Sequence, residues 1–261
     1  MITAISGLPG SGKTEWIREQ IARNQRKAVY FSPQTANFPI DDLRLQSTES
    51  KVQVFFTGGI EELSKFAQTG GEVYLELPWH LDLLAAESLL QKLNCHRVAI
   101  ISSPEDCFQW QSWADELVLN YRTGIDKWLS RLEKQQLKIQ QALLRGEVLD
   151  FSSLETFWRE LTEGAYGEVF RVKGIFDIAQ GESIYGEFSC GLPPQDFESL
   201  QLPLSLQGRP ERFSGIEIIG DNLDKEAIAD TLGDCCLSDE AIFYYQEQIK
   251  QSLSLEEEEI Q

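Results

Sequence analysis

The sequence predicts an α/β fold with a mostly parallel sheet, followed by a small α+β domain. Three observations lead to this class. Short apolar runs alternate with helical patterns over the first 120 residues, a longer helical pattern follows, and strand patterns dominate much of the remainder. Alternating strands and helices imply crossover connections, which make neighbouring strands parallel and cover both faces of the sheet. We place the domains at residues 1–150 and 151–261, the second ending in an acidic tail.

Six short apolar runs in the first domain have the length of buried strands. They cover residues 2–6, 28–32, 52–56, 72–77, 96–102 and 116–120. Helical patterns fill the connections at residues 13–24, 59–69, 80–94 and 106–114. In such folds ligands bind at the carboxyl ends of the strands, so the loop after the first strand is well placed for a binding site.

The pattern changes near residue 125. Residues 125–147 predict one long, charged, amphipathic helix with apolar positions at Trp128, Leu132, Ile139, Leu143 and Leu144. A second helix is expected at residues 154–162. Strand patterns follow at residues 169–178, 183–190 and 213–219, and helices at residues 224–235 and 239–252 close the chain. These elements would form the small α+β domain.

Composition indicates a folded, soluble protein. With 261 residues, 42% of them apolar, the chain can bury a substantial core. It has no run of eighteen apolar residues and no signal-like start, so we expect a cytoplasmic protein without membrane insertion. The net charge of −19 would repel phosphate backbones, which argues against a nucleic-acid partner. The run 256–259, four glutamates, is either a solvated tail or a docking segment for a basic partner.

The cysteines predict neither a disulfide framework nor a zinc site, because they are five in number, scattered, and form no C-x-x-C pair. They are Cys95, Cys107, Cys190, Cys235 and Cys236. Of the two adjacent cysteines, we expect one to be buried and one half-exposed.

A phosphate-binding motif follows the first expected strand. The pattern G-x-x-x-x-G-K-[ST] is met by Gly7-Leu8-Pro9-Gly10-Ser11-Gly12-Lys13-Thr14, here called the phosphate loop. Its backbone N–H groups would wrap the phosphates, with Gly7, Gly10, Ser11 and Gly12 in the cradle. Lys13 would reach the β- and γ-phosphates, and Thr14 would ligate Mg²⁺. The loop therefore predicts a site for GTP or ATP with Mg²⁺.

Two further stretches, in the second half of the chain, carry a family resemblance. They are Val169-Phe170-Arg171-Val172-Lys173-Gly174-Ile175 and Ile218-Ile219-Gly220-Asp221-Asn222-Leu223-Asp224. Together with the phosphate loop, they resemble the CobW family of P-loop GTPases, proteins linked to the handling of metal cofactors. The resemblance spans most of the chain. It implies a GTP-binding domain followed by a CobW-type C-terminal domain.

The family's E-x-x-G motif, near the γ-phosphate, aligns with Glu76-Leu77-Pro78-Trp79. The resemblance implies that Glu76 acts in catalysis together with Lys13. Trp79 replaces a glycine that would offer its N–H to the γ-phosphate without obstruction, and the indole would crowd that approach. From the residues alone, Glu76 is equally a capping or solvent-facing carboxylate at the end of a strand.

The family's guanine-reading motif N-K-x-D aligns with Asn120-Tyr121-Arg122-Thr123. Asn120 is retained, and the resemblance implies that it binds the nucleotide. The lysine and the aspartate are absent, and the aspartate is the group that distinguishes guanine from adenine. GTP preference is therefore inferred from the resemblance. Asp126 either substitutes for the aspartate or caps a helix that begins at Lys127.

The family's C-x-C-C motif has no counterpart here, because the equivalent stretch is Phe55-Phe56-Thr57-Gly58-Gly59. Soft metals would lack thiolate ligands. We expect His80 and His96 at a helix start or a core edge rather than at a metal. Asp41 and Asp42, in the loop after the second strand, are candidates for the carboxylate that holds Mg²⁺, or else turn residues after Pro39.

Three functions fit these features. The first is a CobW-like nucleotide-binding protein with weak or absent hydrolysis, whose nucleotide orders loops that dock a client protein during cofactor or complex assembly. The second is an active GTPase metallochaperone, with metal ligands from Cys190, Cys235 or a client. The third is a P-loop kinase of small molecules, although the evenly charged segment 119–150 does not resemble an arginine-rich lid.

Overall fold

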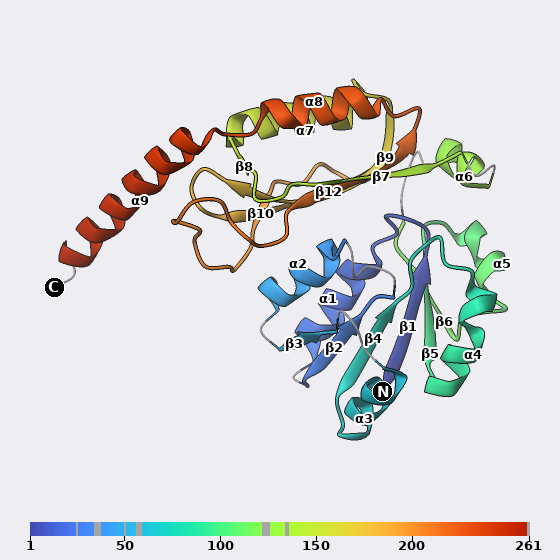
Figure 1. Ribbon diagram of the computed structural model, residues 1–261. Coiled ribbons are helices and arrows are strands. Elements are labelled where there is room, and N and C mark those ends of the chain that lie inside the picture. The colour runs from blue at the N-terminus through green and yellow to red at the C-terminus, as the bar shows by residue number, and fades with distance from the viewer. Residues whose placement is uncertain are drawn as a thin grey trace. The chain divides into compact units, whose positions relative to one another are not determined.

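The computed structural model describes residues 1–24, 26–33, 38–49, 51–55, 59–121, 126–133 and 136–259. The chain divides into two compact units, Met1–Thr123 and Gly124–Gln261. The first contains a parallel sheet and the second a largely antiparallel one (Figure 1). The predicted α/β fold with a following α+β unit is confirmed.

The sheet of the first unit has six strands, and every pairing between them is parallel. Their spatial order is β3-β2-β4-β1-β5-β6, so β1 lies between β4 and β5. The carboxyl end of β1 is therefore flanked by strands on both sides, as a ligand site in this class of fold requires. The strands are β1 (Ile2–Gly7), β2 (Ala28–Phe31), β3 (Val52–Val54), β4 (Glu72–Glu76), β5 (His96–Ile101) and β6 (Glu116–Leu119).

Helices cover both faces of this sheet because the strands are apolar on both sides. On β1, Ile2 and Ala4 join a core with α3 and α4, whereas Ile5 joins a second core with Ile17 of α1 and Leu45 of α2. This alternation is the two-residue period of a strand. The helices are α1 (Lys13–Arg23), α2 (Ile40–Thr48), α3 (Ile60–Gln68), α4 (Leu83–Leu93), the 3₁₀ turn η1 (Pro104–Asp106) and α5 (Cys107–Trp110).

The second unit is built on a sheet of order β11-β10-β9-β12-β7, with the short β8 pairing in parallel with β9. The long central strand β9 pairs in antiparallel with both β10 and β12. The strands are β7 (Lys138–Leu143), β8 (Val148–Leu149), β9 (Glu168–Ile178), β10 (Ser183–Ser189), β11 (Glu198–Ser199) and β12 (Gly215–Asp221).

One hydrophobic core holds this second unit together. Leu154 and Phe157 of α7 pack with Ile228 of α8 and with Val172 and Phe176 of β9. Figure 1 shows α7 and α8 side by side and α9 leaving the sheet toward the C-terminus. The helices of the unit are α6 (Asp126–Glu133), α7 (Phe151–Glu163), α8 (Lys225–Asp234) and α9 (Asp239–Glu259). Helix α9 continues through the glutamate run to Glu259.

The predicted single helix at residues 125–147 is wrong. A short helix, α6, occupies Asp126–Glu133, and residues 138–143 form β7. The latter pairs with β12 in a register that sets Ile139 opposite Ile219. Pairing with a strand far along the chain outweighs a local helical pattern, and it leaves Leu143 exposed while Leu144 is buried.

None of the five cysteines, all of which lie among the described residues, forms a disulfide. Cys235 is buried and Cys236 half-buried, as predicted. Within the described residues, no helix combines the length and the apolar composition that crossing a lipid bilayer requires.

Candidate nucleotide-binding site

The phosphate loop connects β1 directly to α1, because β1 ends at Gly7 and α1 begins at Lys13. The three glycines of the loop have positive φ angles: 154° at Gly7, 68° at Gly10 and 90° at Gly12. Side chains disfavour this region of backbone conformation. A turn inside the loop is closed by the Ser11 N–H, which donates to the Leu8 carbonyl at 3.1 Å.

Space restricts two of these glycines as well. A Cβ at Gly7 would lie 2.5 Å from the carbonyl oxygen of Ile100, and a Cβ at Gly12 would lie 2.5 Å from Nδ2 of Asn120. Both contacts are shorter than real Cβ atoms make. The two glycines therefore allow the neighbouring chain to lie directly against the loop.

The start of α1 fits an anion. Its N-cap residue is Gly12, and no side chain caps the helix. A helix N-terminus carries backbone donors and a partial positive charge, which together favour phosphate. The Lys13 ammonium donates to the carbonyl oxygens of Gly7 at 3.2 Å and Leu8 at 3.1 Å, so the cation is held at the loop. Its side chain is buried.

Thr14 is a further buried polar residue of the loop. Its hydroxyl donates to Oε2 of Glu76 at 2.9 Å. Glu76 is the last residue of β4, the strand next to β1, and it lies opposite Ile5 in the sheet register. Sheet pairing thus brings together two residues that are 62 positions apart. A hydroxyl oriented by a carboxylate is a suitable ligand arrangement for Mg²⁺.

A second hydroxyl reaches the same carboxylate oxygen. Tyr30 of β2 is fully buried and donates to Oε2 of Glu76 at 3.0 Å. Burial, followed by the charges of Glu76, Asp41 and Asp42, raises the pKa of Tyr30 well above its usual value. The phenol therefore remains a donor. Sequence reasoning missed Tyr30; a polar-tipped side chain near the end of an otherwise apolar strand was the available signal.

Asp41 and Asp42 lie in the first turn of α2, not in a loop as predicted. Acidic residues stabilise the N-terminal turn of a helix by interacting with its dipole, which favours a helix directly after Pro39. Asp42 is buried. Both carboxylates are close enough to Tyr30 to raise its pKa, so α2 brings negative charge toward Glu76.

The described residues contain no group of three or more His, Cys, Asp or Glu side chains able to hold a metal. Mg²⁺ commonly binds through one or two protein oxygens together with substrate phosphates and water. The residues present, Thr14 with Glu76 behind it, fit that type of site.

Asn120 fastens the end of the sheet to the phosphate loop. Its backbone N–H donates to the Ile101 carbonyl, and its side-chain Nδ2 donates to the Ser11 carbonyl at 2.8 Å. Tyr121, the next residue, is exposed. Arg122, Thr123 and the side chain of Asp126 lie outside the described residues, so the prediction about base recognition is untested.

Trp79 and His80 follow Glu76 closely. Their rings pack edge to face with centroids 5.5 Å apart. Trp79 is half-buried and His80 exposed. His96 begins β5, and its Nε2 lies 3.2 Å from Glu116. Of the stretch equivalent to the family's cysteine motif, Phe56, Thr57 and Gly58 lie outside the described residues.

The first unit has a hollow of about 540 Å³ at the amino ends of its strands, opposite to the phosphate loop. It is lined by the starts of β1, β5 and β6 and by α1, including Trp16, Tyr74 and His96. Apart from His96, it contains none of the residues singled out in the sequence.

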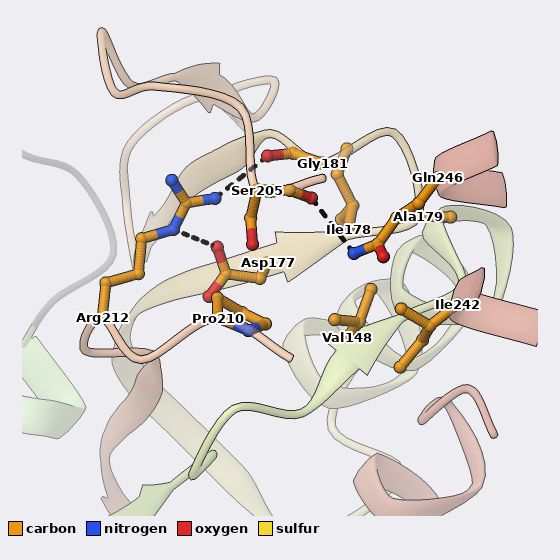
Figure 2. A pocket seen from close by; sticks show the side chains of 10 residues that line it. All are labelled: Val148, Asp177, Ile178, Ala179, Gly181, Ser205, Pro210, Arg212, Ile242 and Gln246. Atoms are coloured by element: carbon orange, nitrogen blue, oxygen red, sulfur yellow. Dashed lines mark hydrogen bonds and ion pairs between the residues drawn. The ribbon is translucent and has the colours of Figure 1, made fainter. Parts of the chain in front are cut away.

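The second unit contains a small cavity of about 10 Å³, enough for roughly one water molecule. Figure 2 shows Arg212 directed at Asp177 and at the Gly181 carbonyl, with Gln246 of α9 reaching the Ser205 carbonyl. The Arg212 Nε donates to Asp177 at 2.6 Å. These contacts fasten the long connection between β11 and β12, so we assign this cavity a structural role.

Comparison with known protein families gives a match in the second unit. Residues 141–236 match the family described as the cobalamin synthesis protein CobW C-terminal domain. That match includes β9 and β12, which carry the two stretches of the sequence resemblance. No curated protein matches the chain.

Two solved structures are similar over most of the chain. The crystal structure of the Zn(II)-bound YjiA GTPase from E. coli is 15% identical with a TM-score of 0.33, and that of a Zn(II)-bound triple mutant of YjiA is 14% identical with a TM-score of 0.32. Each alignment covers 90% of this chain and 98% of the other. At these TM-scores the likeness supports no argument about fold or site. The family match supports the resemblance in the second half of the sequence: residues 141–236 match the C-terminal domain of the CobW family.

Proposed function

We propose that this chain binds a nucleoside triphosphate with Mg²⁺ and acts as a CobW-like assembly factor for a cofactor or complex. The nucleotide is GTP by family resemblance, and hydrolysis is weak or absent. The observation that carries the proposal is the phosphate loop at the start of α1, joined through Thr14 to Glu76.

The residues divide the binding between them. Backbone N–H groups at Gly10 and Gly12 would bind phosphate oxygens. The Ser11 N–H would exchange the Leu8 carbonyl, and the Lys13 ammonium its loop carbonyls, for oxygens of the phosphates. Thr14 would ligate Mg²⁺, which offsets the charge of the phosphates when bound. Glu76 would orient Thr14 by accepting its hydroxyl proton in a hydrogen bond.

Weak hydrolysis is proposed because Trp79 stands where the resemblance expects a glycine. Its half-buried indole packs against His80, which favours a fixed bulky group beside Glu76. Binding without rapid turnover suits a conformational clamp, in which the nucleotide orders segments that dock a client protein. We propose that the segment ordered by the nucleotide is α2, because its residues Asp41 and Asp42 act electrostatically on Tyr30, which is bonded to Glu76.

The metallochaperone alternative gains no support from Cys235, one of the two cysteines named as metal ligands for it. Burial raises the pKa of Cys235 to about 11, so this thiol stays protonated and is a poor metal ligand. The small-molecule kinase stays an alternative that phosphorylation of a metabolite would favour. The cytoplasmic location and the client remain predictions from the sequence.

Calorimetric titration of the pure protein with GTP and with ATP, in Mg²⁺, tests the proposal. Lys13→Ala should weaken binding by about 100-fold or more, because charge-assisted hydrogen bonds contribute about 1.5–3 kcal/mol each. Lys92→Ala, at an exposed position near the end of α4, is the matched control and should bind as wild type. Absence of binding to wild type, or equal binding by Lys13→Ala, would contradict the proposal.

A further inference from the structure

We propose that Tyr30 is a positioning residue of the Mg²⁺-nucleotide site. Its phenol holds the Glu76 carboxylate in the orientation in which that carboxylate directs the Thr14 hydroxyl. The inference rests on the proposed function and deepens it, because it adds Tyr30 to Thr14 and Glu76. Tyr30 belongs to β2, which does not pair with β1, the strand that leads into the phosphate loop.

The geometry is a convergence of two donors on one oxygen. Thr14 Oγ1 and Tyr30 Oη lie 2.9 Å and 3.0 Å from the same Oε2 atom of Glu76. All three side chains are buried, with exposed fractions of 4% for Thr14, 0% for Tyr30 and 7% for Glu76. A carboxylate bound to Thr14 alone could rotate about its side chain. The second donor, fixed in the core, opposes that rotation.

The sheet determines why a tyrosine reaches this position. Tyr30 lies opposite Tyr74 in the register of β2 with β4, and Glu76 is two residues further along β4, on the same face. The ring of Tyr30 packs in the core with Ile17, Ile21 and Tyr74. The ring is therefore immobilised by apolar contacts, while its hydroxyl extends to the site.

Charge makes the hydrogen bond necessary. A buried carboxylate is costly unless donors stabilise it, and Asp41 and Asp42 add negative charge to the same neighbourhood. Without the hydrogen bond from Tyr30, the Glu76 carboxylate would turn toward other donors or toward solvent. Thr14 would then lose its oriented acceptor.

The same sheet contains a matched control. Tyr74 donates to Oε2 of Glu72 at 2.7 Å, at the opposite end of β4. Glu72 is also buried, and it accepts from Asn24 as well. Tyr74→Phe thus removes a buried Tyr–Glu hydrogen bond of the same type without affecting Thr14 or Glu76.

The test measures affinity for GTP with Mg²⁺ and again with EDTA, for wild type, Tyr30→Phe and Tyr74→Phe. Removing a residue that supports a metal ligand typically weakens metal affinity by about 10- to 100-fold. We expect Tyr30→Phe to lose about that factor of the Mg²⁺-dependent affinity and to match wild type in EDTA. Tyr74→Phe should match wild type in both buffers. Thermal unfolding without nucleotide shows how much each variant loses in stability alone.

A double-variant cycle with Glu76→Gln separates positioning from general loosening of the core. If Tyr30 acts through Glu76, adding Tyr30→Phe to Glu76→Gln should cause no further loss of Mg²⁺ dependence. Three outcomes would overturn this inference and leave the proposed function standing. They are a Tyr30→Phe protein that depends on Mg²⁺ as wild type does, equal losses of affinity in both tyrosine variants, and additive losses in the cycle. Wild-type protein that binds no nucleotide would overturn the proposed function and this inference with it.

Discussion

At the scale of single residues, Gly12 combines two constraints that act on the same atom position. Its φ of 90° is strained for any other residue, and Nδ2 of Asn120 lies only 2.5 Å from where a Cβ would be placed. Asn120 uses that nitrogen to bind the Ser11 carbonyl. A side chain at position 12 would therefore disturb the loop and the group that fastens it.

Gly12→Ala should lower the free energy of unfolding by at least about 1–2 kcal/mol, the cost of the left-handed conformation, and weaken nucleotide binding. Gly233→Ala is the control, because Gly233 is in α8, is exposed, and would have no neighbouring atom within 4 Å of an added Cβ. That variant should gain about 1 kcal/mol from helix propensity. Urea unfolding measures both; a Gly12→Ala protein as stable as wild type would contradict the account.

Much of the residue-level site lay within reach of the sequence because the phosphate loop is a local motif. Its eight residues are consecutive, and their spacing alone carries the chemistry. The role of Tyr30 was harder to predict: its polar tip near the end of an apolar strand was a signal, but its contact with Glu76 spans 46 positions and depends on the strand register. The roles assigned to Lys13, Glu76, Asn120 and the aspartates of α2 remain predictions for experiment.

At the scale of elements, the connection between β11 and β12 depends on buried polar contacts more than on regular structure. Arg212 bonds Asp177 of β9, the Gly181 carbonyl and the Pro203 carbonyl. Asp177 is almost completely buried. Burial raises the pKa of Asp177, and the charge of Arg212 and the hydroxyl of Ser183 only partly oppose that effect.

The raised pKa of Asp177 fixes the sign of a pH effect. The folded protein binds the proton of the Asp177 carboxyl group more tightly than the unfolded chain does. The contribution of this group to stability is therefore complete below its ordinary pKa of about 3.9 and is lost as pH rises through the raised pKa. The unfolding free energy of wild type minus that of Asp177→Asn should fall as pH rises from about 4 through the raised pKa of Asp177. Urea titrations across that range test this; a difference that grows with pH would show the opposite shift.

The elements also show where sequence patterns fail. Strands β1, β4 and β5 were predicted because continuous apolar runs are buried on both faces. The short α2 was missed, as nine residues after a proline give little periodicity. The strand β7 was taken as helix because its apolar residues also fit a helical spacing, and its partner β12 is about 76 positions away.

At the scale of the molecule, the features that indicate function are distributed over both units. The phosphate loop, Glu76 and Asn120 belong to the first unit, whereas the match to the CobW C-terminal domain lies in the second. The central claim concerns the first unit: a triphosphate with Mg²⁺ binds at the phosphate loop.

Hydrogen–deuterium exchange read out by mass spectrometry, with and without a non-hydrolysable GTP analogue in Mg²⁺, tests that claim most directly. Bound phosphate should slow exchange of the amides at residues 10–14, at the start of α1, because those N–H groups become donors to the ligand. Lys13→Ala should abolish the protection. Unchanged exchange at residues 10–14 under conditions where the analogue binds, or protection confined to other segments, would contradict the account.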